Sequence, residues 1–274
     1  MQRPPDVSLS GFLFEQSGPL AGGIESARDE CIDPRIVHFY TIAIGVDNFS
    51  RTGLRYGLPS CFLDFLSSRD EVVDYCIDNA ADLALFCGDA YKSRDPTQTH
   101  QREFAKRIAR LSSAGIPVFL LTGNHDMPLV SGKATALEIF RTLEVTNVYT
   151  ADRMDTYRVP TAHGPVQIVG VPWVRRSQML TRDDMRGLSP DQVNEEIQRR
   201  LTDAIRVEAS SLDPDLPALL AGHVTVSGAV TSSEQSMLLG REHVLLKSSV
   251  ALPQFDYVAL GHIHKHQVLG EEPL

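Results

Sequence analysis

The sequence predicts an α/β protein, built as a sandwich of two sheets with helices on the outside. Short apolar runs alternate with amphipathic helical segments in the first half of the chain, which is the pattern of parallel strands joined by crossover helices. The second half carries several apolar runs without long helices between them, which favours a mixed sheet. With 274 residues, 42% hydrophobic and 22% charged, the chain has the composition of a soluble globular protein that buries a sizeable core.

The elements of the first half follow from apolar periodicity and from helix-end signals. In the first long helix, apolar residues recur three, four and seven positions apart. The second helix ends at Gly115, and Pro117 follows, as helix C-termini commonly do. We therefore expect, in order, strand Arg35–Phe39, helix Leu58–Ala80, strand Asp82–Cys87, helix Gln101–Ala114, strand Val118–Leu121 and a weaker helix Lys133–Leu143.

The second half contributes mainly strands. Its one long helix, Asp191–Ser210, carries an apolar stripe on an otherwise polar surface. The expected strands are Val145–Tyr149, Thr156–Val159, Val166–Val171, Pro217–Ala221 and Tyr257–Leu260. Residues 1–33 are rich in Gly, Pro and Ser and are predicted to be a poorly ordered tail before a single domain over 34–274.

Four of these strands are each followed by a glycine and then by a side chain that can bind a metal or transfer a proton. The four segments are Gly88-Asp89, Gly123-Asn124-His125-Asp126, Gly222-His223 and Gly261-His262-Ile263-His264. A single Gly-Asp or Gly-His pair is common in loops and predicts nothing. Four such segments at strand ends predict one convergent site, because open α/β sheets bind ligands at the carboxyl ends of their strands.

The side chains in these segments suit divalent transition metals. Imidazoles come from His223, His262 and His264, while Asn124 offers an amide oxygen and Asp89 a carboxylate that could bridge two ions. Two ions about 3.5–4 Å apart would clamp a phosphate and activate a water molecule.

The four segments resemble the signature of the calcineurin-like metallophosphoesterases. The stretches GDAYKSRDPTQTHQREFAKRI, LTGNHDMP and FDYVALGHIHKHQVL are more narrowly similar to the SbcD family of DNA double-strand-break repair exonucleases, which are nuclease partners of an SMC-like ATPase. The resemblance extends from about Arg35 to the end of the chain. It implies a four-layer α/β/β/α sandwich with mixed sheets.

The resemblance also implies roles for individual residues. Asp89 would bridge two Mn²⁺ ions, His264 would belong to one site, and the other would be completed by Asn124, His223 and His262. In the same family, His125 would be the general acid that protonates the leaving oxygen, with Asp126 orienting its imidazole.

One family motif is broken in this chain. The family carries Asp-x-His at the end of its first strand, where this chain has Thr41 and Ala43 in the segment HFYTIAIG. Neither residue replaces the missing ligands, and Asp47 is a weak candidate for rescue. We therefore expect one metal site to be impaired and the intrinsic activity to be in doubt, because two-metal catalysis needs both ions.

Taken together, the resemblance implies a metal-dependent phosphodiesterase acting on DNA, a 3′–5′ exonuclease and endonuclease subunit of an SbcCD-like double-strand-break repair and recombination complex. DNA, the ATPase subunit and a second copy of the chain are the partners we consider; Lys92, Arg94, Arg175 and Arg176 are candidate DNA contacts. Two alternatives stay open: a catalytically degenerate protein that binds DNA ends or the ATPase, and a phosphodiesterase for small molecules.

Charge and composition narrow the expectations further. The net charge of −9 argues against nucleic-acid binding by bulk basicity. Four cysteines without CxxC spacing, no signal-peptide pattern and no long apolar run predict a cytoplasmic protein that does not span a membrane. The chain ends soon after His264, so we expect the nuclease domain to be incomplete at its C-terminus and to lack the family's DNA-binding cap.

Overall fold

The computed structural model describes residues 14–16, 34–39, 60–128, 130, 132–230 and 244–270. Thr41, Ala43 and Asp47, at and near the broken motif, lie outside these residues. Within the predicted tail of residues 1–33, a short strand is described at 14–16.

The first sheet is mainly parallel and has five strands in the order β1-β2-β3-β4-β5. Strands β2 to β5 are parallel to one another, and β1 pairs antiparallel with β2. The strands are β1 (Phe14–Gln16), β2 (Ile36–Phe39), β3 (Leu83–Phe86), β4 (Val118–Leu121) and β5 (Val148–Ala151). The crossover helices are α1 (Ser60–Asp78), α2 (Gln98–Ser113) and α3 (Glu138–Thr142).

The second sheet is mixed and has four strands in the order β11-β8-β7-β6. Strands β6 and β7 form an antiparallel pair, whereas β7, β8 and β11 are parallel. The strands are β6 (Asp155–Thr161), β7 (Gly164–Val171), β8 (Ala218–Gly222) and β11 (Tyr257–Leu260). Around them lie α4 (Arg176–Met179), α5 (Pro190–Ser210), α6 (Lys247–Val250) and a two-stranded ladder of β9 (Thr225–Val226) and β10 (Val244–Leu245).

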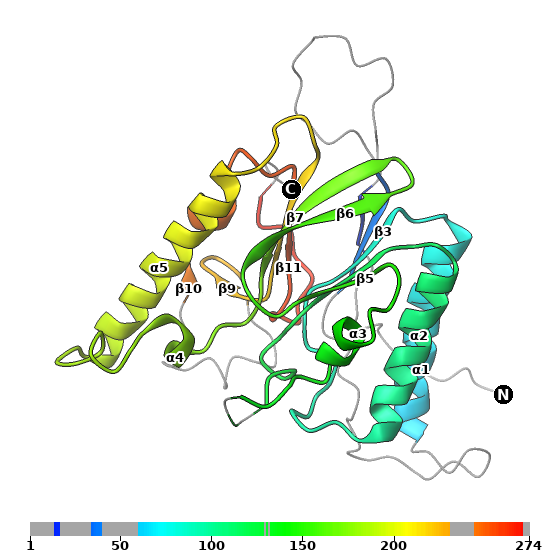
Figure 1. Cartoon of the computed structure of the whole chain (residues 1–274), viewed down its shortest axis with the longest axis horizontal. Helices are drawn as coiled ribbons and strands as arrows, with labels where there is room; N and C mark the ends of the chain where they lie inside the picture. Colours follow the sequence, from blue (N-terminus) through cyan, green and yellow to red (C-terminus); the bar gives the residue numbers. More distant parts are fainter. Residues whose placement is uncertain are drawn as a thin grey trace.

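Three apolar cores lie in succession through the molecule. Alternate side chains of the first sheet, such as Val37 and Phe86, pack under α1 and α2. Their neighbours, such as Ile36 and Leu85, meet the second sheet, because successive side chains of a strand point to opposite faces. The far face of the second sheet packs against α5, and Figure 1 shows α1 and α2 at one side of the sheets and α5 at the other.

The α/β class, the mainly parallel first sheet and the mixed second sheet are therefore confirmed. Most predicted elements are present with bounds that differ by a few residues, and two of them depart most from the prediction. The helix predicted over Lys133–Leu143 is only α3, and the strand predicted over Val145–Tyr149 begins at Val148. Glu144 and Asn147 both have left-handed backbone, with φ of 49° and 56°, so a turn occupies the start of that predicted strand.

Among the residues that the structure describes, no helix combines the length and the apolarity that crossing a membrane requires.

Candidate metal centre

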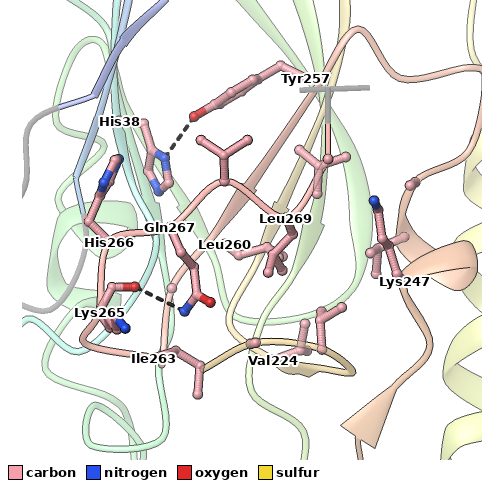
Figure 2. A pocket seen from close by; sticks show the side chains of 18 residues that line it. His38, Val224, Lys247, Tyr257, Leu260, Ile263, Lys265, His266, Gln267 and Leu269 are labelled. Atoms are coloured by element: carbon pink, nitrogen blue, oxygen red, sulfur yellow. Dashed lines mark hydrogen bonds between the residues drawn. The ribbon is translucent and has the colours of Figure 1, made fainter. Parts of the chain in front are cut away.

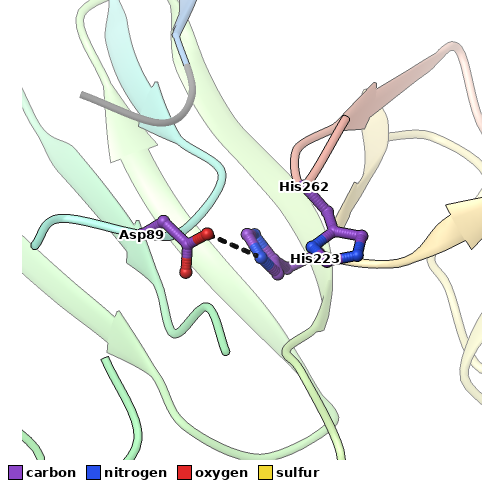
Figure 3. Close-up of side chains that lie close together, drawn as sticks. All are labelled: Asp89, His223 and His262. Atoms are coloured by element: carbon purple, nitrogen blue, oxygen red, sulfur yellow. Dashed lines mark ion pairs between the residues drawn. The ribbon is translucent and has the colours of Figure 1, made fainter. Parts of the chain in front are cut away.

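Side chains from the ends of four strands meet at one place between the two sheets. Asp89 follows β3 in the first sheet, while His223 follows β8 and His262 follows β11 in the second. One ligand atom from each lies within 4.8 Å of those of the other two, and all three residues are buried; Figure 3 shows the ring of His223 beside the Asp89 carboxylate and the ring of His262 next to it. Asn124, from the loop after β4, places its Oδ1 3.0 Å from Nε2 of His223 and 3.2 Å from Nδ1 of His262.

The backbone around these side chains is unusually tight. A Cβ atom added at Gly123 would overlap the carboxylate and backbone nitrogen of Asp89, and one at Gly261 would overlap the carbonyl oxygen of Cys87. Asp89 and His262 have left-handed backbone, with φ of 60° and 78°. Such conformations are uncommon for residues with a side chain and cluster at functional sites. The glycines therefore belong to the site because they let its loops approach.

The hydrogen bonds of His223 show that the group is suited to a cation. Its Nδ1 lies 2.7 Å from the carbonyl oxygen of Cys87, so this nitrogen donates and a neutral ring presents the lone pair of Nε2. That lone pair faces two oxygens, Oδ1 of Asn124 at 3.0 Å and Oδ2 of Asp89 at 3.4 Å. Three electron-rich atoms turned toward one another need a proton or a metal ion between them. A carbonyl that fixes the tautomer of a ligand histidine is a common feature of metal sites.

The charges of the site favour a cation as well. Burial would raise the pKa of Asp89, but the charge and hydrogen bond of His223, with a contribution from His125, lower it to about 2. Burial would lower the pKa of His223, and its pairing with Asp89 outweighs burial and raises it. When no metal is bound, the pairing with Asp89 therefore favours the protonated form of His223. An incoming metal ion would displace that proton.

Asp126 has a different place from the one predicted. Its two carboxylate oxygens accept hydrogen bonds from the backbone N–H groups of Asp89, Ala90 and Gly123, each at 2.9 Å. It is buried, and burial together with the charge of Asp89 raises its pKa to about 7. The expectation that Asp126 orients the imidazole of His125 is therefore corrected: Asp126 ties the loop after β3 to the loop after β4.

His125 lies at the edge of the site and is half-buried. Its backbone N–H donates to Oδ1 of Asp89 at 2.9 Å, and its ring Nδ1 lies 2.8 Å from the carbonyl oxygen of Lys92. The carbonyl of Lys92 orients the ring in the way that was expected of Asp126. Nδ1 then donates, and Nε2 is the nitrogen that could exchange a proton with a substrate.

His264 is not a member of the group of candidate ligands that lie closest together in the described part of the chain. Within the described ranges, the group of potential ligands with atoms within 4.8 Å contains Asp89, His223 and His262. His264 is exposed and lies outside this group.

Trp173 belongs to the site although no sequence motif pointed to it. Its ring centroid lies 4.9 Å from that of His262 and 6.3 Å from that of His223. It follows β7, whose carboxyl end lies beside those of β8 and β11. The strand-end rule that located the other residues would have found it.

The predicted DNA contacts differ in their surroundings. Lys92 and Arg94 are exposed. Arg175 donates from its guanidinium to the carbonyl of Pro128, and Arg176 donates to Oδ1 of Asn194 at 3.1 Å.

A separate, mainly apolar pocket of about 110 Å³ lies beside β11 and is lined by His38, Tyr257 and the segment Ile263–Gly270, apart from His264. Figure 2 shows the ring of His38 pointing toward the hydroxyl of Tyr257, which lies 3.1 Å from its Nδ1. Asp89, His223 and His262 do not line this pocket, so it is distinct from the metal centre.

Comparisons with known proteins agree with this geometry. The chain is 24% identical over 245 residues to the SbcD subunit of the nuclease SbcCD from Escherichia coli strain K12, covering 86% of this chain and 57% of the relative. It is 26% identical over 185 residues to the SbcD subunit from Staphylococcus epidermidis, covering 67% and 46%. The chain thus spans about half the length of these relatives.

A solved structure, the phosphopantetheinyl hydrolase from Mycobacterium tuberculosis, aligns with a TM-score of 0.39 and 13% identity, covering 68% of this chain and 73% of that one. The model of the calcineurin-like phosphoesterase family matches residues 63–266. This match covers well over half of the chain and includes every ligand described above, so the chain belongs to the calcineurin-like phosphoesterase family.

Proposed function

We propose that the chain is a metal-dependent phosphodiesterase of the SbcD type that acts on DNA. The observation that carries this proposal is the convergence of Nε2 of His223 with the oxygens of Asn124 and Asp89. The carboxylate and amide oxygens of this set suit Mn²⁺, and its imidazoles extend the choice to other transition metals. The ion would supply positive charge to a phosphate oxygen and lower the pKa of a bound water molecule.

The chain's own residues perform the remaining work. Asn124, His223 and His262 would hold one ion together with Asp89, whose carboxylate is kept ionised by its pairing with His223. The Lys92 carbonyl accepts from Nδ1 of His125 and leaves Nε2 free for the substrate, and in the imidazolium form Nε2 would protonate the leaving oxygen. Asp126 acts through the backbone, because it fixes the loops that carry Asp89 and Asn124.

The second ion would have fewer ligands. His264 and a share of Asp89 are what the sequence offers it, because Thr41 and Ala43 stand at the broken motif. We infer that the chain binds one Mn²⁺ tightly and the second weakly, and that hydrolysis is slow. The relatives are named as subunits of a nuclease complex, so we extend to this chain a cytoplasmic role in DNA repair beside an SMC-like ATPase.

Two measurements test this proposal. Calorimetric titration with Mn²⁺ should show one tight binding event, which Asn124→Ala weakens and Asp183→Ala, an exposed acid far from the site in sequence, leaves unchanged. Two tight, equivalent events would contradict the inference about the second site.

Hydrolysis of bis(p-nitrophenyl) phosphate and of end-labelled DNA should depend on Mn²⁺ and should increase in the Thr41→Asp/Ala43→His double variant. His125→Ala in that background should remove most of the gain. If the double variant binds two ions but cleaves neither substrate, the alternative of a degenerate binding protein replaces this proposal. Cleavage of the small ester alone would favour the small-molecule alternative.

A further inference from the structure

A cleft of about 440 Å³ is lined by residues that adjoin those of the metal centre in the sequence. It lies between the loop that follows β4 and the loop that joins β7 to α4, and its lining includes Met127, Pro128, Lys133, Arg175 and Gln178. The volume falls within the range of about 300–1,000 Å³ that small-molecule sites occupy.

Two residues of the cleft walls lie one or two positions along the chain from residues of the metal centre. Met127 follows Asp126 in the chain, whose carboxylate holds the loop of Asp89. Arg175 comes two residues after Trp173, whose ring lies against that of His262. The guanidinium of Arg175 crosses between the walls and donates to the carbonyl of Pro128, which fixes their relative position.

The charges in the cleft leave a positive surplus. Its two acidic lining residues, Glu138 and Asp152, both pair with Arg141, at 3.5 Å and 2.9 Å. Across the part of the chain that the structure describes, neither Lys133 nor Arg175 has a carboxylate within ion-pair distance. A cleft with two uncompensated cations in a chain of net charge −9 therefore favours an anionic ligand.

We infer that this cleft is a subsite for the nucleotide that flanks the phosphodiester at the metal centre, with Lys133 and Arg175 facing its phosphate. The inference rests on the proposed function, and it adds a place where the substrate strand is held away from the reacting bond. Arg175 presents the remaining N–H donors of a planar guanidinium, which match phosphate oxygens. The side chain of Lys133 is exposed, so it contributes charge without supporting the fold.

Lys133→Gln is the informative variant because it removes one charge from an exposed position. Its matched control is Arg182→Gln, which removes an exposed charge from the loop between α4 and α5. Binding of a fluorescently labelled single-stranded oligonucleotide is measured by anisotropy between about 20 and 200 mM salt, with Ca²⁺ in place of Mn²⁺ and gel analysis to show that the strand stays intact. Hydrolysis of bis(p-nitrophenyl) phosphate with Mn²⁺ is measured in parallel, because this ester is too small to reach both positions.

Lys133→Gln should weaken oligonucleotide binding about 3- to 10-fold at low salt and reduce the slope of log affinity against log salt by about 0.7, the value for one phosphate contact on a single strand. It should leave the kcat and KM of the small ester unchanged. The inference is overturned if Arg182→Gln has the same effect, if Lys133→Gln has none, or if the unaltered chain fails to bind the oligonucleotide. If the unaltered chain does not hydrolyse the small ester with Mn²⁺, that result would instead count against the proposed function.

Discussion

The buried imidazole of His38 should make the protein less stable as the pH is lowered, and replacing this side chain should remove that contribution. Burial, with a smaller contribution from the charge of His266, lowers the pKa of His38 from 6.5 to about 4. A shift of one pKa unit corresponds to about 1.36 kcal/mol, so the lowering of the His38 pKa amounts to about 3 kcal/mol. That is a large part of the roughly 5–15 kcal/mol by which domains are stable.

The sign follows from which state binds the proton first. Below pH 6.5 the unfolded chain protonates His38, whereas the folded chain resists protonation down to about pH 4. The free energy of unfolding should therefore fall by about 3 kcal/mol as the pH is lowered from 7 to 4, because the unfolded state binds more protons throughout this window.

Urea unfolding of the unaltered chain and of His38→Leu, at several pH values from 7 to 4, measures this term. Other groups titrate in the same range, so the informative quantity is the free energy of unfolding of the unaltered chain minus that of His38→Leu, which should fall by about 3 kcal/mol between pH 7 and pH 4. Tyr257→Phe is the matched control: it removes the hydroxyl 3.1 Å from Nδ1 but keeps the imidazole, so it should retain the pH dependence. An equal pH dependence in His38→Leu and the unaltered chain would refute the reasoning.

Three further predictions concern the metal centre. Asp126→Ala leaves three buried backbone N–H groups without their acceptor. Calorimetry should therefore show an affinity for Mn²⁺ that is at least 10-fold lower, while circular dichroism shows that the variant still folds. Unchanged affinity would show that the two loops keep their shape without the Asp126 carboxylate. Gly123→Ala should weaken Mn²⁺ binding at least as much, because the added Cβ overlaps Asp89; equal affinity in that variant would contradict the tight approach of the two loops. Trp173 is the single tryptophan of the chain and lies 4.9 Å from the ring of His262, so its fluorescence should change as Mn²⁺ binds and should not change in His262→Ala; a constant signal during binding detected by calorimetry would place the ion elsewhere.

Much of the fold could be predicted because its signals are local. The strands Val118–Leu121 and Tyr257–Leu260 were predicted with the bounds that the structure has, since short apolar runs bounded by turns leave few alternatives. The helix predicted over Asp191–Ser210 begins one residue earlier, at Pro190. The start of β5 was misplaced because Glu144 and Asn147 adopt left-handed turns; asparagine favours this conformation, but glutamate rarely adopts it.

The candidate site was also predicted in part from the sequence. Glycines followed by polar side chains at strand ends predicted the meeting of Asp89, Asn124, His223 and His262, because strand order brings carboxyl ends to one edge. Trp173 was missed because it is neither a metal ligand nor a proton-transfer group, although its place after a strand would have pointed to it. The role of Asp126 was mistaken because its partners are backbone N–H groups from two different loops, which no side-chain pattern encodes.

By itself the sequence determined which side chains could bind a metal, because each follows a strand whose apolar character places it in a sheet. The tertiary structure alone decided which atoms face one another: Nε2 of His223 points at two oxygens because the carbonyl of Cys87, 136 residues away in the chain, holds its other nitrogen. Orientation at that scale depends on the packing of two sheets, and packing is a property of contacts between distant segments rather than of any local pattern.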